Sequence, residues 1–340
     1  QHVQLGATAK APRWACAYKL PADQAESKVL SVAHQVGRTG VVTPVCTIAP
    51  VQVGGALLQH ISLHNYQELA RKDVRIVDVV MVRRAGDVIP ELMHVVKEKR
   101  DDATIFVPRP TQCPCCQTPL VQVEDQVAWR CPNVDGCEDQ IIFRVVHFAS
   151  RHAFSIDGLG ERWIALLVQQ GLIKDAADVF TLTEAHLMQL PRMGPKLASN
   201  LLASIAKAKR VRLEKFYYAL GITEVGLQTA KLLATHFPSV EAIRSASAED
   251  FESIEAIGPV MACAIAKFFQ QTSHIRLLDK LLKAGVEAYT EEVVAVEQDQ
   301  AGKVYVITGS FRLPREDIKQ MLSRRGARFT SAMSGKIDAL

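Results

Sequence analysis

The chain has 340 residues, of which 48% are hydrophobic, 22% charged and 6% aromatic. This length allows two or three compact domains, and the composition is that of an ordinary soluble protein. No run approaches the roughly 18 apolar residues that span a membrane, which excludes a membrane protein. The formal net charge of +4 permits a polyanionic partner without requiring one.

The residues at the two ends of the sequence lead us to expect that this chain is part of a longer gene product. The first residues, QHVQLGATAK, lack an initiator methionine and the charged and apolar regions of a secretory signal. The last residues, SGKIDAL, stop without a turn or cap. We therefore expect a reducing, cytosolic compartment, where clustered cysteines are more often metal ligands than disulfides.

Residues 1–22 are basic and end in APRWACAYKLPAD. The alternating Trp-Ala-Cys-Ala-Tyr predicts a strand that presents Lys19 on one face. Its ammonium could pair with a phosphate, although an ordinary surface lysine is the alternative.

Residues 23–107 contain Val- and Ile-rich runs bounded by Gly and Pro, a pattern typical of a small β-barrel. Within them RRAGDVIP predicts a hairpin, in which Arg83 and Arg84 could bind phosphate or carboxylate.

Residues 108–140 hold five of the eight cysteines. Cys113 and Cys116 are spaced C-x2-C, Cys131 and Cys137 are spaced C-x5-C, and 14 residues separate the pairs. Two such pairs on a short hairpin predict a four-sulfur zinc site, structural because no position is left for water. Metal-free reduced cysteines and a disulfide are the alternatives. Cys115 is expected to be a non-ligand.

The remaining cysteines sit in apolar surroundings in the sequence. Cys16, Cys46 and Cys263 are therefore expected to be buried as small hydrophobic residues.

Residues 141–290 predict helices that repeat one design. IDGLGERWIALL (156–167), LPRMGPKLASNLL (190–202), ALGITEVGLQTAKLL (219–233) and IEAIGPVMACAIA (254–266) each place a Gly-containing turn before an apolar helix. Exposed backbone N–H groups at such turns form an anion site suited to phosphates, and close helix packing is the alternative. The candidate contacts are Gly158, Gly160, Gly194, Gly221, Gly226 and Gly258. Arg192 and Ala256 stand where two copies should have their first Gly.

The last part of the chain predicts an acidic linker over 291–300. Residues 301–340 then predict a strand in GKVYVITGS, a helix in REDIKQMLSRRG and a strand in ARFTSAM, which is the start of a β-α-β unit.

These segments, in this order, resemble the bacterial NAD-dependent DNA ligases. APRWACAYKLPAD resembles their last nucleotidyltransferase motif, and VGRTGVVTPVCTIAPVQVGG, ISLHN and RRAGDVIP resemble their OB-fold domain. The cysteine spacing is similar to their zinc finger, the Gly turns to their helix-hairpin-helix domain, and GKVYVITGS with RRGARF to the start of a BRCT domain. The resemblance implies a multidomain α+β protein: 1–22 the end of the adenylation domain, 23–107 OB-type barrel, 108–140 zinc finger, 141–290 all-α DNA-binding domain, 291–300 linker and 301–340 truncated α/β BRCT-like domain.

The resemblance also implies a function. Such ligases seal nicks in duplex DNA during replication and repair: a lysine takes AMP from NAD, AMP passes to the 5′-phosphate, and the 3′-hydroxyl displaces it, with magnesium or manganese assisting. Lys19 would bind near the nucleotide phosphate. The expected setting is the bacterial cytosol and its nucleoid, with a monomer that closes around nicked DNA.

This sequence departs from the family pattern in several respects. The earlier motif lysine and the N-terminal domain that would bind the nicotinamide half are absent, and the BRCT-like portion is roughly half a domain. The sequence contains no Lys-x-Asp-Gly, so the lysine that becomes adenylated is absent and this chain alone is expected not to react with NAD. Two hypotheses follow. The chain is either the DNA-gripping part of a ligase or a non-catalytic, zinc-containing module that binds nicked DNA.

Overall fold

The computed structural model describes residues 5–6, 12–16, 23–86, 88–122, 126–290, 303–306, 318–319, 321–322, 325 and 327–329. The chain divides into two units, Gln1–Ala288 and Tyr289–Leu340. Among the described helices, none has the length and apolar character needed to cross a membrane.

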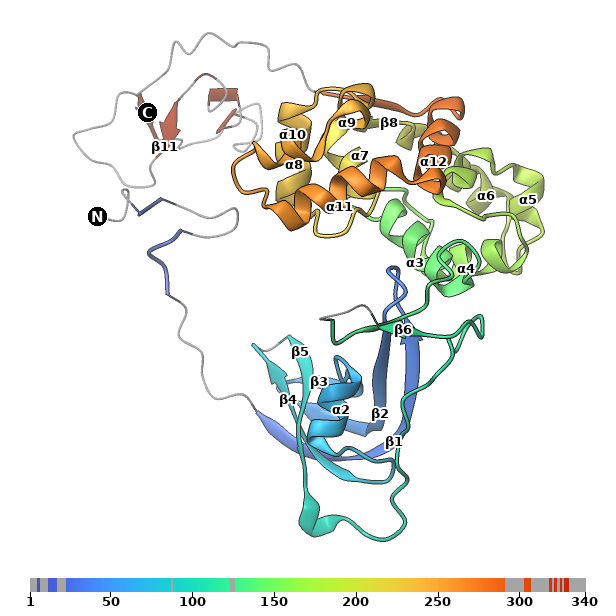
Figure 1. The fold of residues 1–340 in the computed structure, drawn as a ribbon, viewed down its shortest axis with the longest axis vertical. Coiled ribbons are helices and arrows are strands. Elements are labelled where there is room, and N and C mark those ends of the chain that lie inside the picture. The colour runs from blue at the N-terminus through green and yellow to red at the C-terminus, as the bar shows by residue number, and fades with distance from the viewer. Residues whose placement is uncertain are drawn as a thin grey trace. The chain divides into compact units, whose positions relative to one another are not determined.

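The first module is an antiparallel five-stranded sheet (Figure 1), with strand order β3-β2-β1-β4-β5. The strands are β1 (Gln24–Val36), β2 (Val42–Val53), β3 (Ala56–Ser62), β4 (Val79–Ala85) and β5 (Ile89–Val95). The edge strands β3 and β5 also contact each other, which curls the sheet into a small barrel. Alternating apolar side chains fill its interior, including the fully buried Val29, Cys46 and Val80.

A short helix that the sequence patterns did not predict, α2 (Tyr66–Lys72), covers one part of the barrel. It begins where the Asn65 side chain accepts a 2.8 Å hydrogen bond from the Glu68 N–H, and it ends at Asp73 in a left-handed conformation. Farther along, the turn η1 (Lys97–Lys99) precedes Arg100, which pairs with the fully buried Asp78. This pair ties the segment after β5 to the start of β4.

The cysteine-rich module has two short strands, β6 (Val121–Gln122) and β7 (Trp129–Arg130), which pair antiparallel. The guanidinium of Arg109 lies 3.5 Å from the Trp129 ring centroid. This cation–π contact anchors the segment between the barrel and Cys113 to the hairpin. The module is too small for a core of its own, and its buried residues form one cluster with those of the barrel.

The helical module packs around one apolar core, in which Phe148, Phe154, Phe180 and Phe216 form an aromatic cluster. Lys209 accepts a hydrogen bond from Glu287 through its backbone carbonyl, where β8 and β9 pair to close the module. The elements are α3 (Glu138–Ala149), α4 (Glu161–Gln169), η2 (Ala176–Thr181), α5 (Glu184–Met188), α6 (Pro195–Ala208), β8 (Arg210–Arg212), α7 (Leu213–Ala219), α8 (Leu227–His236), α9 (Val240–Ser245), α10 (Ala248–Glu252), α11 (Pro259–Gln270), α12 (Thr272–Lys283) and β9 (Glu287–Tyr289).

In the second unit, β10 (Val304–Tyr305) and β11 (Arg328–Phe329) pair in parallel. Parallel pairing of strands this far apart needs a crossover connection, as a β-α-β unit has. Residues 318–319 and 321–322 are helical, as the sequence predicts, whereas most of the remaining BRCT-like segment and the predicted linker over 291–300 lie outside the described residues.

Two expectations about single residues are wrong. Cys16 and Cys263 are exposed, and only Cys46 of the three isolated cysteines is buried. Cys263 lies on the outer face of α11, where helical spacing carries it away from the core. Residues 13–14 form a turn rather than a strand, and Lys19 lies outside the described residues.

Candidate metal centre and nucleic-acid interface

The structure brings Cys113, Cys116, Cys131 and Cys137 together, with their Sγ atoms all within 4.8 Å of one another. The Sγ atoms of Cys113 and Cys137 are 3.9 Å apart, and those of Cys116 and Cys131 are 3.5 Å apart. Four thiolates about 2.3 Å from a tetrahedral zinc ion would lie about 3.8 Å from one another. The donor type, number and spacing of these residues therefore fit zinc.

Backbone hydrogen bonds shape both ends of this cluster. In the first turn, the Cys113 N–H donates to the Thr118 carbonyl at 2.8 Å, and the Gln117 N–H donates back to the Cys113 carbonyl at 3.0 Å. Gln117 takes a left-handed conformation that reverses the chain there. At the second pair, the Cys137 N–H donates to the Asn133 carbonyl at 3.1 Å, and α3 begins at the next residue. The cluster is thus connected directly to the helical module.

The electrostatics of the four thiols also favour a cation. Burial raises the pKa of Cys113, Cys131 and Cys137 above the usual value for a thiol. The pKa of Cys116 is lowered to about 6: burial acts to raise it, but hydrogen bonds involving Thr118 and Cys131 outweigh that effect. Without a cation, three of the thiols would stay protonated beside one thiolate. A bound metal ion would stabilise all four as thiolates.

Cys115 lies beside Cys137 but is not one of the four mutually close cysteines. Its Sγ accepts a 3.4 Å hydrogen bond from the Asp139 N–H in the first turn of α3. The side chain thus points to the helix terminus, consistent with the expectation that Cys115 is not a ligand.

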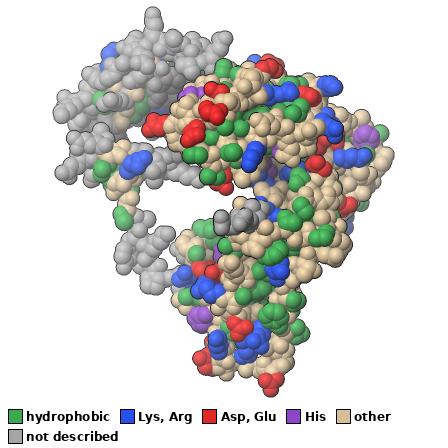
Figure 2. Space-filling model, in the orientation of Figure 1, with side chains coloured by type: hydrophobic (Ala, Val, Ile, Leu, Met, Phe, Trp, Pro, Cys, Tyr) green, Lys and Arg blue, Asp and Glu red, His purple; other side chains and the backbone are tan. Residues whose placement is uncertain are grey.

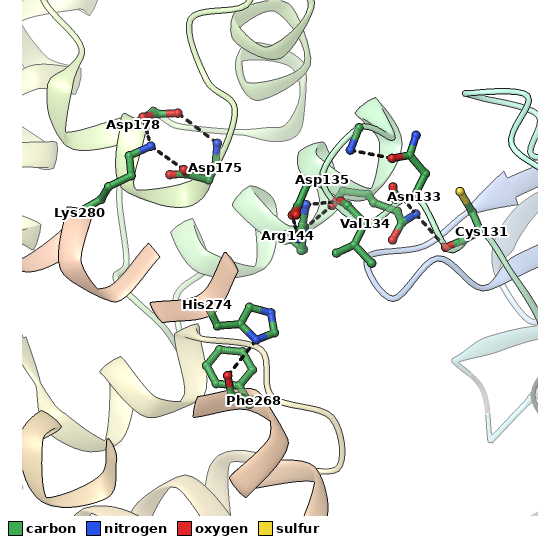
Figure 3. Close-up of polar contacts among 12 residues, drawn as sticks. Cys131, Asn133, Val134, Asp135, Arg144, Asp175, Asp178, Phe268, His274 and Lys280 are labelled. Atoms are coloured by element: carbon green, nitrogen blue, oxygen red, sulfur yellow. Dashed lines mark hydrogen bonds and ion pairs between the residues drawn. The ribbon is translucent and has the colours of Figure 1, made fainter. Parts of the chain in front are cut away.

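A three-way junction lies beside the cluster, and Figure 3 shows the part of it around Cys131 and Asn133. The buried side-chain amide of Gln140 donates to the carbonyls of Cys131 and Asn133, at 3.2 and 3.3 Å. The Cys131 N–H donates to the carbonyl of Gly40, in the turn between β1 and β2, at 2.8 Å. In the same turn, Arg38 Nη1 donates to the carbonyl of Gly221 at the end of α7, at 3.0 Å. The barrel, the cysteine module and the helical module therefore meet at one place.

The helix starts of the helical module differ in their caps, and α3, α7 and α12 begin at Cys137, Arg212 and Gln271 without a side-chain cap. Side chains of Asp175, Thr183, Ser239 and Ser247 cap η2, α5, α9 and α10. In contrast, α4, α6, α8 and α11 each begin at a glycine with no side-chain cap: Gly160, Gly194, Gly226 and Gly258. The free N–H groups of these four helices are open to an external acceptor.

The four uncapped turns share one backbone geometry. The residue two positions before each N-cap glycine has a positive φ: Gly158 (+85°), Arg192 (+67°), Glu224 (+65°) and Ala256 (+75°). Gly226 begins the third helix of the repeat, as expected, but Glu224 and not Gly221 holds the left-handed position two residues before it. Gly221 instead follows α7 and accepts the hydrogen bond from Arg38. Sequence reasoning missed Glu224 because it searched for glycine where only a left-handed backbone is needed.

The surroundings of the N-cap glycines do not support the interpretation that glycine permits close helix packing. A Cβ built on Gly160, Gly194, Gly226 or Gly258 meets no atom within 4 Å. Their φ angles lie between −84° and −103°, which any residue adopts. Neither internal packing nor backbone conformation requires glycine here, and the space beside each glycine is open.

The barrel arginines are already engaged with protein groups. Arg83 pairs with Glu91 at 2.9 Å, and Arg84 donates to the Gly54 carbonyl at 2.6 Å. A phosphate would have to share or displace these partners. In Figure 2, basic and acidic side chains are interspersed over the described surface.

Comparisons with known protein families match the barrel, the cysteine module and the helical module. Residues 26–104 match the model of the NAD-dependent DNA ligase OB-fold domain, and residues 112–138 match the NAD-dependent DNA ligase C4 zinc finger domain. Residues 150–207 match a SAM-like helix-hairpin-helix tandem, and residues 215–278 match a helix-hairpin-helix motif.

Several similar proteins are named DNA ligase. One from Alkalilimnicola ehrlichii is 44% identical over 341 residues, 99% of this chain and 50% of its own length. One from Coxiella burnetii (strain CbuK_Q154) is 42% identical over 336 residues, 98% of this chain and 50% of its own length. One from Roseiflexus sp. (strain RS-1) is 40% identical over 343 residues, 100% of this chain and 47% of its own length. The chain thus spans about half the length of the curated relatives it matches.

Proposed function

We propose, on the premise that this chain carries the OB-fold, C4 zinc-finger and helix-hairpin-helix domains of the NAD-dependent DNA ligases, that it forms the part of such an enzyme that grips nicked duplex DNA. The whole enzyme would seal the nick by adenylate transfer and phosphodiester formation in replication and repair. The observation that carries this proposal is the set of four uncapped helix starts at glycine, where an added Cβ would meet no atom within 4 Å.

The described residues suggest how the grip works. Backbone N–H groups at Gly160, Gly194, Gly226 and Gly258 would donate to phosphate oxygens, and such contacts read no base sequence. The left-handed residue before each turn aims these groups outward. Exposed cations of the helical module, such as Lys207 at the end of α6, would add attraction that depends on salt. Arg83 and Arg84 of the barrel are further candidate phosphate contacts.

We assign the four-cysteine site a structural zinc ion. Cys113, Cys116, Cys131 and Cys137 would fill all four positions of the ion, which leaves none for water or substrate. The ion would stabilise a module that lacks its own core and hold the junction around Gly40 and Gln140. Its contribution is therefore to fix the barrel and the helical module as one DNA-binding surface.

The chemistry of ligation would depend on groups beyond these residues. NAD would supply the adenylate and magnesium or manganese would assist its transfer, while Lys19 would bind the nucleotide phosphate. Because the sequence contains no Lys-x-Asp-Gly, this chain by itself should not become adenylated. The setting would be the cytosol and nucleoid of a bacterium, with a monomer that closes around DNA.

Fluorescence anisotropy with matched 30-base-pair duplexes, one nicked and one intact, tests the grip. We expect binding that prefers the nick, is the same for unrelated base sequences, and weakens steeply as salt rises. A salt-insensitive or sequence-selective affinity would contradict the proposal.

The enzymatic part needs the full-length gene product, incubated with NAD labelled in its adenylate half. A covalent protein–AMP adduct supports a ligase. Its absence, together with intact nick binding, would favour a non-catalytic DNA-binding module.

A further inference from the structure

A cavity of about 220 Å³ lies at the three-way junction, where the turn between β1 and β2 meets the cysteine module and helices α3, α7, α11 and α12. Nothing in the proposed grip on DNA uses it. Its polar wall is formed by Arg38, Arg130, Arg144, His147, Asp175 and His274.

The charge on this wall is mainly positive. Among the described residues, neither Arg38 nor Arg130 has an acidic partner: Arg38 donates to the Gly221 carbonyl, and Arg130 to Gln126 and the Thr39 carbonyl. Arg144 donates to the Val134 carbonyl at 2.5 Å, and its nearest carboxylate, that of the exposed Asp135, is 3.7 Å away (Figure 3). Three guanidinium groups thus face the cavity with little compensation.

The one acidic side chain on the wall does not neutralise them. Asp175 accepts a 2.5 Å hydrogen bond from Lys280 and also caps η2 through the Ala177 N–H (Figure 3). Lys280 also bonds to Asp178 at 2.6 Å, so it is shared by two carboxylates and the three groups together keep one negative charge. The three guanidinium groups outnumber that charge, so the net demand of the cavity is for an anion.

The two histidines supply acceptors. Burial lowers the pKa of both His147 and His274, so each ring is neutral near pH 7. Nε2 of His147 bonds to the Tyr218 carbonyl at 2.9 Å, and Nδ1 of His274 bonds to the Phe268 carbonyl at 3.1 Å. These bonds fix the tautomers, which leaves the other nitrogen of each ring with a lone pair. A ligand that carries a hydroxyl or N–H donor could be recognised there.

The remaining wall is apolar and partly aromatic. Phe148, Leu277 and the Phe268 ring line it, and Phe268 stacks on His274 with centroids 3.8 Å apart. An engineered cavity of about 150 Å³ admits benzene. The present cavity is therefore large enough for one substituted aromatic ring and too small for a nucleotide.

We propose that this cavity binds a small single-ring organic anion: an aromatic carboxylate that also carries a hydrogen-bond donor. The carboxylate lies against the guanidinium groups of Arg38 and Arg144, the donor faces a histidine nitrogen, and the ring packs on the apolar wall. Because its wall comes from all three modules, the bound ligand stabilises the junction among them.

Calorimetric titration of the zinc-loaded chain with 4-hydroxybenzoate tests the proposal, with 4-hydroxybenzamide as the uncharged comparison. We expect saturable one-to-one binding of the carboxylate, at least about tenfold tighter than that of the amide. No saturable binding of 4-hydroxybenzoate, or equal affinity for the two compounds, overturns the proposal.

Variants locate the site. Arg38→Gln and Arg144→Gln should each weaken binding at least about tenfold, and Thr223→Trp, an exposed lining position, should block the cavity without disturbing the core. Arg71→Gln, on α2 of the barrel, is the control and should bind as the parent does. Zinc content and the urea unfolding curve show that each variant is folded. If an arginine variant fails to fold, the binding affinity of Thr223→Trp tests the location of the site. Unchanged binding of 4-hydroxybenzoate by Thr223→Trp would show that the ligand does not occupy this cavity.

Discussion

The Cys131 N–H donates a 2.8 Å hydrogen bond to the Gly40 carbonyl, so a thiol of the metal cluster is tied directly to the tip of a barrel hairpin. Gly40 has a φ of +77°, and a Cβ there would lie 2.5 Å from the Cys131 carbonyl oxygen and 3.1 Å from Oε1 of Gln140. Both the backbone conformation and the available space therefore require glycine. The contact makes the cysteine module and the barrel one structural unit.

Replacing Gly40 by alanine should destabilise this unit by about 2 kcal/mol or more, since a left-handed alanine alone costs roughly 1–2 kcal/mol. Urea unfolding followed by circular dichroism measures the change. Gly37 lies in the same turn but has only an ordinary 3.7 Å contact at its Cβ position. Gly37→Ala is therefore the matched control, and equal losses for the two variants would refute the close approach at Gly40.

Cys131→Ser should release the zinc ion and expose residues 108–140 to proteases, because metal binding replaces a core in this module. Cys115→Ser is the matched control: its sulfur accepts from the Asp139 N–H and is not one of the four clustered sulfurs. Inductively coupled plasma mass spectrometry measures the zinc content of both variants. We expect one zinc ion per chain in Cys115→Ser and loss of zinc in Cys131→Ser. Zinc loss in Cys115→Ser with retention in Cys131→Ser would reverse the assignment.

Gly258→Asp should separate stability from DNA binding. An aspartate at this N-cap can bond to the free N–H groups of α11 and should keep or raise the free energy of unfolding. The same carboxylate would repel a phosphate, so affinity for nicked duplex should fall at least about tenfold. Anisotropy and urea unfolding on the same samples measure both effects.

Ser247→Ala supplies the opposite pattern for comparison. It removes the cap of α10 and should cost about 1 kcal/mol of stability, while DNA affinity stays within about twofold. Unchanged DNA binding in Gly258→Asp would mean that this turn does not contact phosphate.

The sequence predicted elements that depend on local pattern and missed those set by tertiary contacts. The four-cysteine cluster and the Gly-turn repeat depend on spacing along the chain, and both were visible. Helix α2 was missed because its seven residues depend on the Asn65 cap and on packing against the barrel. Gly221 was wrongly assigned to the turn before α8. The left-handed residue of that turn is Glu224, and a sequence search for glycine does not find it.

The junction could not be predicted at all. Arg38 and Gly221 are 183 residues apart, and nothing in either segment indicates that the guanidinium donates to that carbonyl. The same holds for Gln140, whose amide looks like an ordinary helix residue in the sequence but is fully buried between two carbonyls. Long-range polar contacts of this kind leave no local periodicity to detect.

The helical module should lose stability as the pH falls below about 6.5. Burial, with the nearby Arg38 or Arg144, lowers the pKa of His147 and His274 in the folded state. Above pH 6.5 both histidines are neutral in the folded and the unfolded protein, so the free energy of unfolding is not reduced by their protonation. Below 6.5 the unfolded chain binds protons first, so each histidine can remove at most about 1.4 kcal/mol per pH unit. Urea unfolding at pH 7.5, 6.5 and 5.5 measures the slope, which His147→Gln should reduce. A slope that His147→Gln leaves unchanged would contradict this assignment.

Asp78→Ala should be among the most destabilising single changes in the barrel. The side chain is fully buried and accepts hydrogen bonds from Arg100, at 2.6 and 2.8 Å, and from the Arg75 N–H at 2.7 Å. Its removal leaves the largely buried Arg100 guanidinium with Asp73 as its remaining carboxylate partner, so the cost should approach the about 3–5 kcal/mol of a buried pair broken from one side. Glu68→Ala breaks an exposed pair with Arg71 on α2 and should cost below about 1 kcal/mol. Urea unfolding of both variants at pH 7 compares the two costs. Equal losses would mean that the Asp78 contacts do not organise the barrel, whereas the expected difference would place the Arg100 pair among the contacts that hold its strands together.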